Sequence, residues 1–251
     1  MQREEQLTRE MVSCSLLERR MTQMKTEAKT QDIVRRLLLL APLIAAFIIA
    51  ADPLSAQTEP VRKTIIVLGD SLAAGYGIDP SQAFPALVQK KIDDAGWDYA
   101  VVNAGVSGDT TADGLSRTDW LLQRRVDVLI LELGGNDGLR GIAPEETKAN
   151  LQAIIDRVRQ KYPQAQFVVA GMRMPPNMGQ QYNAAFQKIF SDLAAKNKAA
   201  LIPFLLEGVG GRPDLNQEDH IHPTEEGHRI VAENVWKILR PVLEKMNAGR
   251  S

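Results

Sequence analysis

The stretch Thr64-Ile-Ile-Val-Leu-Gly-Asp-Ser-Leu72 decides the fold class of this chain. Its first five residues are rich in β-branched and apolar side chains, which predicts a short buried strand. Gly69 stops this strand and permits a tight turn, and the residues after the turn predict the start of a helix. Ser71 therefore lies where a buried strand turns into a helix, next to free backbone N–H groups of the helix N-terminus.

The same alternation of short apolar runs and longer amphipathic stretches continues along the chain. Further strands are predicted at 99–102, 127–133, 166–170 and 200–203, and helices at 84–95, 110–124, 144–162, 182–196 and 224–244. Nearly continuous apolar strands that alternate with helices are typical of a parallel sheet covered on both faces. Residues 57–251 are therefore predicted to form a single domain, a three-layer α/β/α sandwich with a five-stranded parallel sheet.

Residues 1–56 are predicted to be an N-terminal leader. Arg35 and Arg36 precede an apolar run over 37–51, which is shorter than the roughly 20 residues that span a membrane. Basic residues, an apolar run of this length and a small-residue end favour a signal peptide, with cleavage after Ala56. We therefore expect a periplasmic or secreted protein without a stable membrane anchor; a retained anchor and a buried core helix are the alternatives.

The polar part of the leader is long for a signal peptide. Met21 and Met24 lie shortly before the basic pair, and a start at either residue would shorten the polar part of the leader. The sequence therefore favours one of these methionines as the natural start.

Composition excludes several classes of function. The 251 residues carry a formal net charge of −1 and no long run of Lys or Arg, so no nucleic-acid partner is expected. The single cysteine, Cys14, lies in the leader, which excludes a disulfide or a thiol nucleophile from the mature chain. No pair of histidines has ligand spacing with a third ligand nearby, so we expect no metal and no cofactor.

Four clusters of small and polar residues follow the predicted strands. They are Gly69-Asp70-Ser71-Leu72, Asn103-Ala104-Gly105, Gly134-Gly135-Asn136-Asp137 and Asp219-His220-Ile221-His222-Pro223. Ligands of parallel sheets bind beyond the carboxyl ends of the strands. Because all four clusters fall on that edge, we expect them to lie together.

A serine ester hydrolase needs a nucleophile, a base, a residue that orients the base and donors for the oxyanion. His222 is the best base, since a single turn can bring the Asp219 carboxylate to its ring and Pro223 rigidifies that turn. His220 is the runner-up. His228 lies inside the last predicted helix, where a surface or packing role is expected.

Three other residues in the clusters each have a plain structural interpretation. Ser71 could cap a helix, Gly105 could form a left-handed turn and Asn136 could be a turn residue. Their occurrence in order on one edge instead favours a nucleophile and two oxyanion donors, the Gly105 N–H and the Asn136 amide. Ala73 stands where an α/β-hydrolase elbow has its second glycine, so that fold is excluded.

These four clusters resemble the four sequence blocks of the SGNH (GDSL) hydrolase superfamily. The resemblance implies a flavodoxin-like SGNH hydrolase fold and a serine esterase. It makes Ser71 the nucleophile and Asp219 and His222 the rest of the triad. Gly105 and Asn136 complete the oxyanion hole with the Ser71 N–H.

Within the superfamily, the chain is most similar to the bacterial arylesterase and thioesterase I/lysophospholipase L1 group. The segments that carry this similarity are Gly75-Tyr76-Gly77, Ser107-Gly108-Asp109-Thr110-Thr111 and Arg173-Met174-Pro175-Pro176-Asn177. The similarity implies a small-molecule acyl ester or thioester substrate. Candidate substrate contacts are Asp70, Met174, Pro175 and Asn177. His220 departs from the group, which usually has glycine there.

Other functions fit parts of this pattern. A carbohydrate O-deacetylase or an acyltransferase would use the same scaffold. A catalytically silent ligand-binding module is disfavoured by the intact set of five site residues. Nucleotide binding is disfavoured because no Gly-x-Gly-x-x-Gly or Walker pattern follows the first strand. Acyl-chain length, leaving group and oligomeric state stay open.

Overall fold

The computed structural model describes residues 62–249, together with Met21, Gln23 and Met24 of the leader. The chain divides into two units, 1–60 and 61–251. The predicted apolar run and the cleavage site after Ala56 lie outside the described residues. Among the residues that are described, no helix has the length and apolar character needed to cross a membrane.

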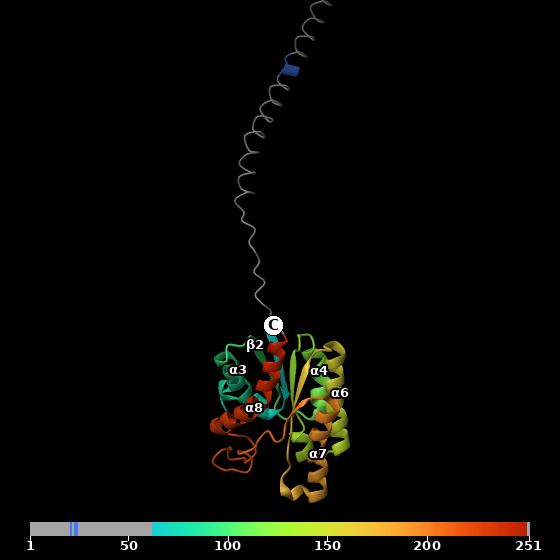
Figure 1. Ribbon diagram of the computed structural model, residues 1–251, viewed down its shortest axis with the longest axis vertical. Coiled ribbons are helices and arrows are strands. Elements are labelled where there is room, and N and C mark those ends of the chain that lie inside the picture. Colours follow the sequence, from blue (N-terminus) through green and yellow to red (C-terminus); the bar gives the residue numbers. More distant parts are fainter. Residues whose placement is uncertain (1–20, 22, 25–61, 250–251) are drawn as a thin grey trace, which may run out of the picture. The chain divides into compact units, whose positions relative to one another are not determined.

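Five parallel strands form one sheet in the order β2-β1-β3-β4-β5 (Figure 1). The strands are β1 (Lys63–Gly69), β2 (Tyr99–Gly105), β3 (Val128–Glu132), β4 (Gln166–Ala170) and β5 (Ala200–Ile202). Each neighbouring pair is parallel, which confirms the predicted sheet.

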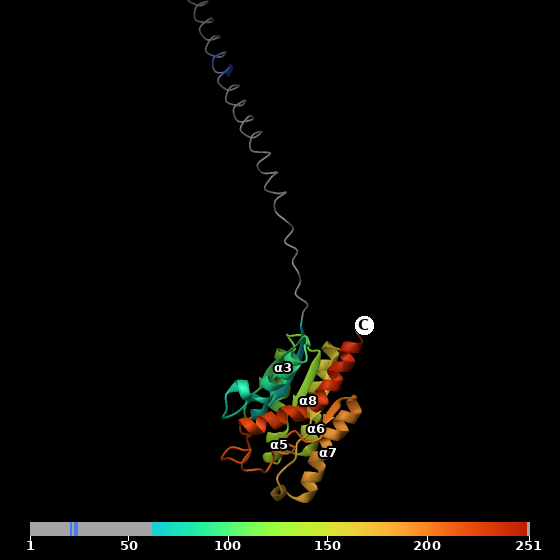
Figure 2. The same cartoon turned by 60° about the vertical axis from the view of Figure 1, so that its left-hand side comes forward.

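Helices cover both faces of this sheet. They are α2 (Ser71–Ala74), α3 (Phe84–Asp94), α4 (Thr111–Leu121), α5 (Gly135–Leu139), α6 (Pro144–Lys161), α7 (Gln180–Asn197) and α8 (Glu225–Ala248), with 3₁₀ turns η1 (Pro80–Gln82) and η2 (Pro176–Met178). Helices α3 and α8 pack together on one face, and α4, α6 and α7 form the layer on the other (Figures 1 and 2). The three-layer α/β/α architecture is thus confirmed.

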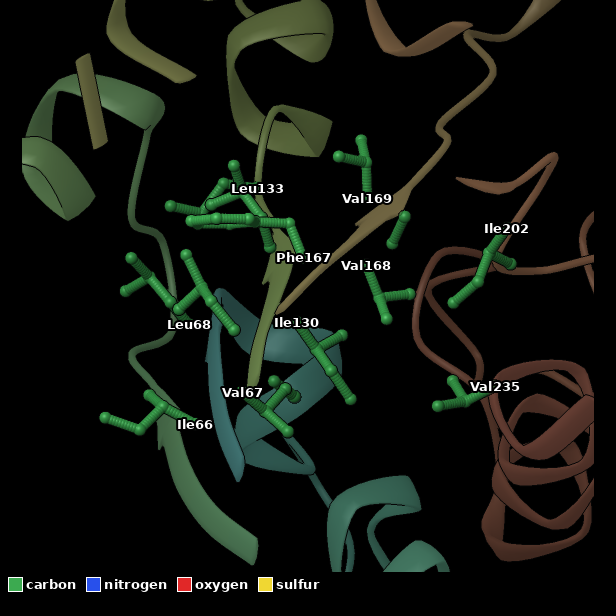
Figure 3. Packing of buried hydrophobic residues seen from close by; sticks show 14 of the residues in the cluster. Ile66, Val67, Leu68, Ile130, Leu133, Phe167, Val168, Val169, Ile202 and Val235 are labelled. Carbon is green, nitrogen blue, oxygen red and sulfur yellow. The ribbon is translucent and has the colours of Figure 1, made fainter. Parts of the chain in front are cut away.

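The alternation of side chains along the strands builds two apolar layers. Successive residues of a strand point to opposite faces, so Val67 and its register partner Ile130 share one face while Leu68 faces the other. Ile202 of β5 and Val235 of α8 lie together on the first side, as Figure 3 shows. All five side chains are at most 1% exposed, and each contributes about 1.5–3 kcal/mol by its burial.

Strand β2 and helices α5 and α8 differ from the expectation. Strand β2 continues to Gly105 because Asn103 lies on an edge strand, where a polar side chain can face solvent. Helix α8 continues through Pro241 to Ala248, since the buried Leu239 and Leu243 on either side hold it against the core. The short helix α5 was not predicted, whereas the helix predicted to start at Ser71 is α2, which ends at Ala74.

Strand register brings the predicted clusters to one level. Gly69 at the end of β1 pairs with Gly105 of β2 on one side and with Glu132 of β3 on the other. The residues that follow these three positions therefore emerge side by side at the carboxyl edge of the sheet.

Candidate active site

Ser71 is the first residue of α2, directly after the turn that ends β1. The residue before it, Asp70, is the N-cap, and Asp70 Oδ1 accepts a hydrogen bond from the Leu72 N–H at 3.0 Å. The capping role that Ser71 could have had thus belongs to Asp70. The Ser71 hydroxyl is left for other contacts.

Position 69 must be glycine because the turn has no room for a side chain. A Cβ at this position would lie 2.2 Å from Glu132 Oε2 and 2.7 Å from the Ala73 Cβ. The backbone of Gly69 does not adopt a positive φ, so its conformational freedom is not what the turn uses. Glycine therefore allows the close approach of a carboxyl group to the nucleophile turn.

Ser71, His222 and Asp219 form one chain of hydrogen bonds. The Ser71 Oγ lies 2.9 Å from His222 Nε2, and His222 Nδ1 lies 2.5 Å from Asp219 Oδ2. The other Asp219 oxygen accepts from the backbone N–H groups of Ile221 and His222 at 2.9 and 3.0 Å. This arrangement has the geometry of a nucleophile, its base and the residue that orients the base.

The charge of Asp219 is stabilised at this position. Its slight burial opposes ionisation, but the hydrogen bonds from the His222 ring and from the two backbone N–H groups lower the pKa of Asp219 to about 2. The carboxylate therefore stays ionised at neutral pH and can hold the Nδ1 proton of the imidazole.

The loop that carries His222 is held at both ends. An antiparallel bridge joins Asn216 to Pro223, and the Gln217 N–H donates to the His222 carbonyl at 2.7 Å. Thr224 then caps α8 through the Gly227 N–H. The imidazole is thus presented by a closed loop that ends at a helix N-terminus.

The other two histidines lie in different surroundings. His220, the runner-up base, is exposed and has a left-handed φ of 58°, a conformation that glycine adopts with less strain than histidine. His228 is buried on α8, and its Nδ1 accepts from the Phe84 N–H at 3.2 Å. His228 therefore has the packing role.

Tyr76 is a neighbour of the site to which the sequence alone assigned no role. Its ring centroid lies 4.6 Å from that of His222, and Tyr76 is 52% exposed. Gln217 Nε2 donates to the Tyr76 carbonyl at 2.7 Å and so ties this segment to the histidine loop. A Cβ on Gly77 would lie 2.1 Å from Gln217 Oε1, which accounts for the second glycine of this segment.

Two of the predicted oxyanion donors already have acceptors. The Gly105 N–H donates to Asn103 Oδ1 at 2.9 Å, and Asn136 Nδ2 donates to the Asp109 carbonyl at 3.0 Å and to Asp70 Oδ2 at 3.3 Å. A substrate oxyanion would share these donors with the protein acceptors or replace them.

Gly105 has no left-handed backbone, so the alternative of a left-handed turn does not apply. A Cβ there would lie 2.4 Å from the Ala74 nitrogen and 2.8 Å from the carbonyl carbon of Ala73. The glycine thus lets β2 approach the nucleophile helix α2 closely.

The predicted substrate contact at Asp70 has a different role in the structure. Asp70 is only 2% exposed, and its two oxygens accept from Leu72 and Asn136. Burial raises the pKa of Asp70 to about 6, although the Leu72 N–H and the charge of His222 act against this. Asp70 therefore positions other site residues instead of contacting substrate.

The remaining candidate substrate contacts lie on the loop after β4. Met174 is half-buried, and its side chain covers Gly138, where a Cβ would lie 2.1 Å from the sulfur. Gly138 belongs to α5, the helix that carries Asn136. Pro175 and Asn177 are exposed on the same loop, and their contact with a substrate stays a prediction.

The described residues contain no group of three or more His, Cys, Asp or Glu side chains that could hold a metal ion.

An α/β/α sandwich with serine, histidine and aspartate joined at the carboxyl edge of its sheet has the architecture of a serine hydrolase. The chain matches the model of the GDSL-like Lipase/Acylhydrolase family over residues 67–230, more than half of its length, and belongs to that family. Its family makes it an ester hydrolase, as the sequence predicted.

Similar proteins include several bacterial enzymes. The chain is 44% identical to esterase TesA of Pseudomonas aeruginosa over 74% of this chain and 92% of that protein. It is 40% identical to thioesterase 1/protease 1/lysophospholipase L1 of Escherichia coli, over 72% of this chain and 85% of that protein. A crystal structure of TesA, 44% identical, aligns with a TM-score of 0.69 over 71% of this chain and 99% of that one.

Proposed function

We propose that this enzyme cleaves esters of small or medium acyl groups through an acyl-enzyme on Ser71. The observation that carries the proposal is the pair of hydrogen bonds that link Ser71 Oγ to His222 Nε2 at 2.9 Å and His222 Nδ1 to Asp219 at 2.5 Å. In this geometry His222 can take the hydroxyl proton as the Ser71 oxygen attacks. An isolated serine has no such base and is a weak nucleophile at neutral pH.

The reaction would follow two displacements. His222 Nε2 accepts the Ser71 proton while Oγ bonds to the acyl carbon, and the carbonyl oxygen becomes an oxyanion. The imidazolium then gives this proton to the leaving oxygen or sulfur as the acyl bond to it breaks. Water attacks the acyl-enzyme with His222 again as the base, and the acid and free serine are restored. Asp219 holds the ring throughout.

The oxyanion would be bound by the Ser71 N–H, the Gly105 N–H and the Asn136 amide. Supporting evidence is their common position at the carboxyl edge, set by the register of β1 and β2 and by the short helix α5. Each donor of this kind contributes about 10²–10³ in rate.

Apolar surface beside the site favours an acyl group over a sugar. Met174 covers Gly138 of α5, two residues after Asn136, and the Tyr76 ring lies against that of His222. Ile221, which precedes His222 in the chain, is 46% exposed. A carbohydrate deacetylase would be expected to offer polar side chains at these places.

The decisive experiment uses the Ser71→Ala variant and a panel of substrates. The panel contains p-nitrophenyl esters of increasing chain length, phenyl acetate, acyl-CoA and lysophospholipid, with acetylated xylan as the alternative. We expect wild-type turnover of short and medium acyl esters, and none by Ser71→Ala at an unchanged Tm. Turnover retained in that variant would reject Ser71 as the nucleophile, and preference for acetylated xylan would reject the substrate class.

The second part of the proposal is export to the periplasm or medium. It is supported by the basic pair Arg35-Arg36, the apolar run 37–51 and the small residues that end at Ala56. N-terminal sequencing of the natively expressed enzyme tests it, with Gln57 expected as the first residue. A cytosolic protein that begins near Met1, Met21 or Met24 would contradict it.

A further inference from the structure

Glu132 is an acidic residue in an otherwise apolar strand. It ends β3, its exposure is 0%, and its register partner is Gly69 beside the nucleophile turn. A carboxyl group at such a place is costly unless hydrogen bonds satisfy it. The hydrogen bonds of Glu132 therefore indicate its role in the structure.

One oxygen of Glu132 binds the backbone on both sides of the nucleophile. Oε2 accepts from the Asp70 N–H and from the Ala73 N–H, each at 3.2 Å. Asp70 precedes Ser71, and Ala73 follows two residues after it. Because α2 has only four residues, its N–H groups have few partners within the helix, and this carboxyl supplies one.

The same segment is held from the opposite strand. Asn103 Nδ2 of β2 donates to the Ala73 carbonyl at 2.7 Å. The backbone N–H and carbonyl of Ala73 are thus both bound by side chains of the sheet, from Glu132 and Asn103. Arg117 Nη2 donates to the Gly69 carbonyl at 3.0 Å. The nucleophile turn is therefore shaped by strands on both sides of β1.

The surroundings of Glu132 disfavour its charged form. Burial raises the pKa of Glu132 well above its ordinary value, and the nearby Asp70 carboxyl raises it further, against the effect of the two N–H donors. Its other oxygen, Oε1, has no hydrogen-bond partner among the described residues. A carboxamide of the same shape would offer an equivalent acceptor oxygen.

We propose that Glu132 is a positioning residue for the nucleophile: its Oε2 fixes the backbone before and after Ser71, and so holds Oγ at His222. This inference rests on the proposed function, in which Ser71 is the nucleophile. Glu132 does not touch the substrate; it acts through the Asp70 and Ala73 peptides.

The test compares Glu132→Gln, which keeps an acceptor oxygen, with Glu132→Leu, which removes it at similar size. We measure kcat and KM for p-nitrophenyl butyrate and the rate at which a fluorophosphonate labels Ser71. For Glu132→Leu, kcat and the labelling rate should each fall about 10–100-fold, as expected for a nucleophile displaced by a fraction of an ångström. KM should change less than about twofold, and Glu132→Gln should stay within about threefold of the wild type.

Leu239→Ala on α8 is the control for general destabilisation, because Leu239 is fully buried and is no part of the site. Its kcat per labelled molecule should match the wild type. If Glu132→Leu does not fold, Glu132→Asp replaces it, since the shorter side chain withdraws the carboxyl from both N–H groups.

Three results would overturn the inference. They are wild-type kcat in Glu132→Leu or Glu132→Asp, an equal loss in Glu132→Gln, and a loss confined to KM. Ser71→Ala is measured in parallel: if it stays active, the proposed function fails, whereas an inactive Ser71→Ala beside fully active Glu132 variants rejects only the role of Glu132.

Discussion

The Asn136 amide donates to the buried carboxylate of Asp70 at 3.3 Å, so the residue that caps the nucleophile helix also orients a proposed oxyanion donor. Asp70 comes from the end of β1 and Asn136 from α5 after β3. The contact couples the position of Ser71 to that of the amide that would bind the oxyanion.

Replacing Asp70 by asparagine should therefore lower kcat. The new carboxamide has one oxygen and one NH₂ group, so its NH₂ would face either the Leu72 N–H or the Asn136 amide, whichever way the side chain turns. We expect a loss of roughly 10–100-fold in kcat, less than full removal of an oxyanion donor. The check is a double-mutant cycle with Asn136→Ala. If Asp70→Asn acts through Asn136, the double variant is no slower than Asn136→Ala, and additive losses would contradict the coupling.

The tilted contact between the Tyr76 and His222 rings gives a second prediction. An aromatic pair of this kind contributes about 0.5–1.5 kcal/mol, so Tyr76→Ala should lower kcat by roughly 2–12-fold through a less restrained imidazole. Tyr76→Phe keeps the ring and should match the wild type. Steady-state kinetics on p-nitrophenyl butyrate check both variants, and an equal loss in Tyr76→Phe would assign the effect to the hydroxyl.

The proposed triad was predictable because the sequence leaves few choices. The chain has three histidines, and only His222 has an aspartate three residues earlier and a proline after it. The strands were predictable because their apolar runs are nearly continuous, and those of β1, β3 and β4 are followed by glycine. Helix α5 was not, because five residues are too few to show a helical period.

The supporting residues were missed because their partners are distant in sequence. Glu132 contacts residues 59 and 62 positions earlier, and the Tyr76 ring contacts a ring 146 positions later. One signal for Glu132 was present: an acid inside an apolar strand is costly and must have a partner. For Tyr76 only the flanking glycines marked the segment.

The left-handed backbone of His220 gives a third prediction. At φ 58° a side chain with a Cβ is strained, so His220→Gly should raise the free energy of unfolding by about 0.5–1 kcal/mol. For a domain of this size the Tm should rise by about 1–4 °C. His220→Ala is the control, because it removes the imidazole but keeps the Cβ. Thermal unfolding measures both, and an equal gain in the alanine variant would show that strain is not the cause.

His228 gives the last prediction, a pH dependence of stability. Burial lowers the pKa of His228 to about 4, with a smaller effect from the charge of His222, whereas an unfolded chain has the ordinary value near 6.5. The unfolded state therefore binds more protons between these values, and the stabilising contribution is fully present above pH 6.5. This contribution is lost as the pH falls toward 4. Between pH 7 and 5 the loss in the free energy of unfolding is about 2 kcal/mol.

Urea unfolding of the wild type and of His228→Asn across pH 4.5–8 measures this contribution. Asparagine keeps an acceptor for the Phe84 N–H but cannot titrate, so the variant should lose less stability on acidification. The raised pKa of Asp70 has the opposite effect on the free energy of unfolding, which it increases as the pH falls from 6 to 3.8. Both proteins contain Asp70, so this effect cancels when their pH profiles are subtracted. Parallel pH profiles for the two proteins would show that His228 is not the group that titrates.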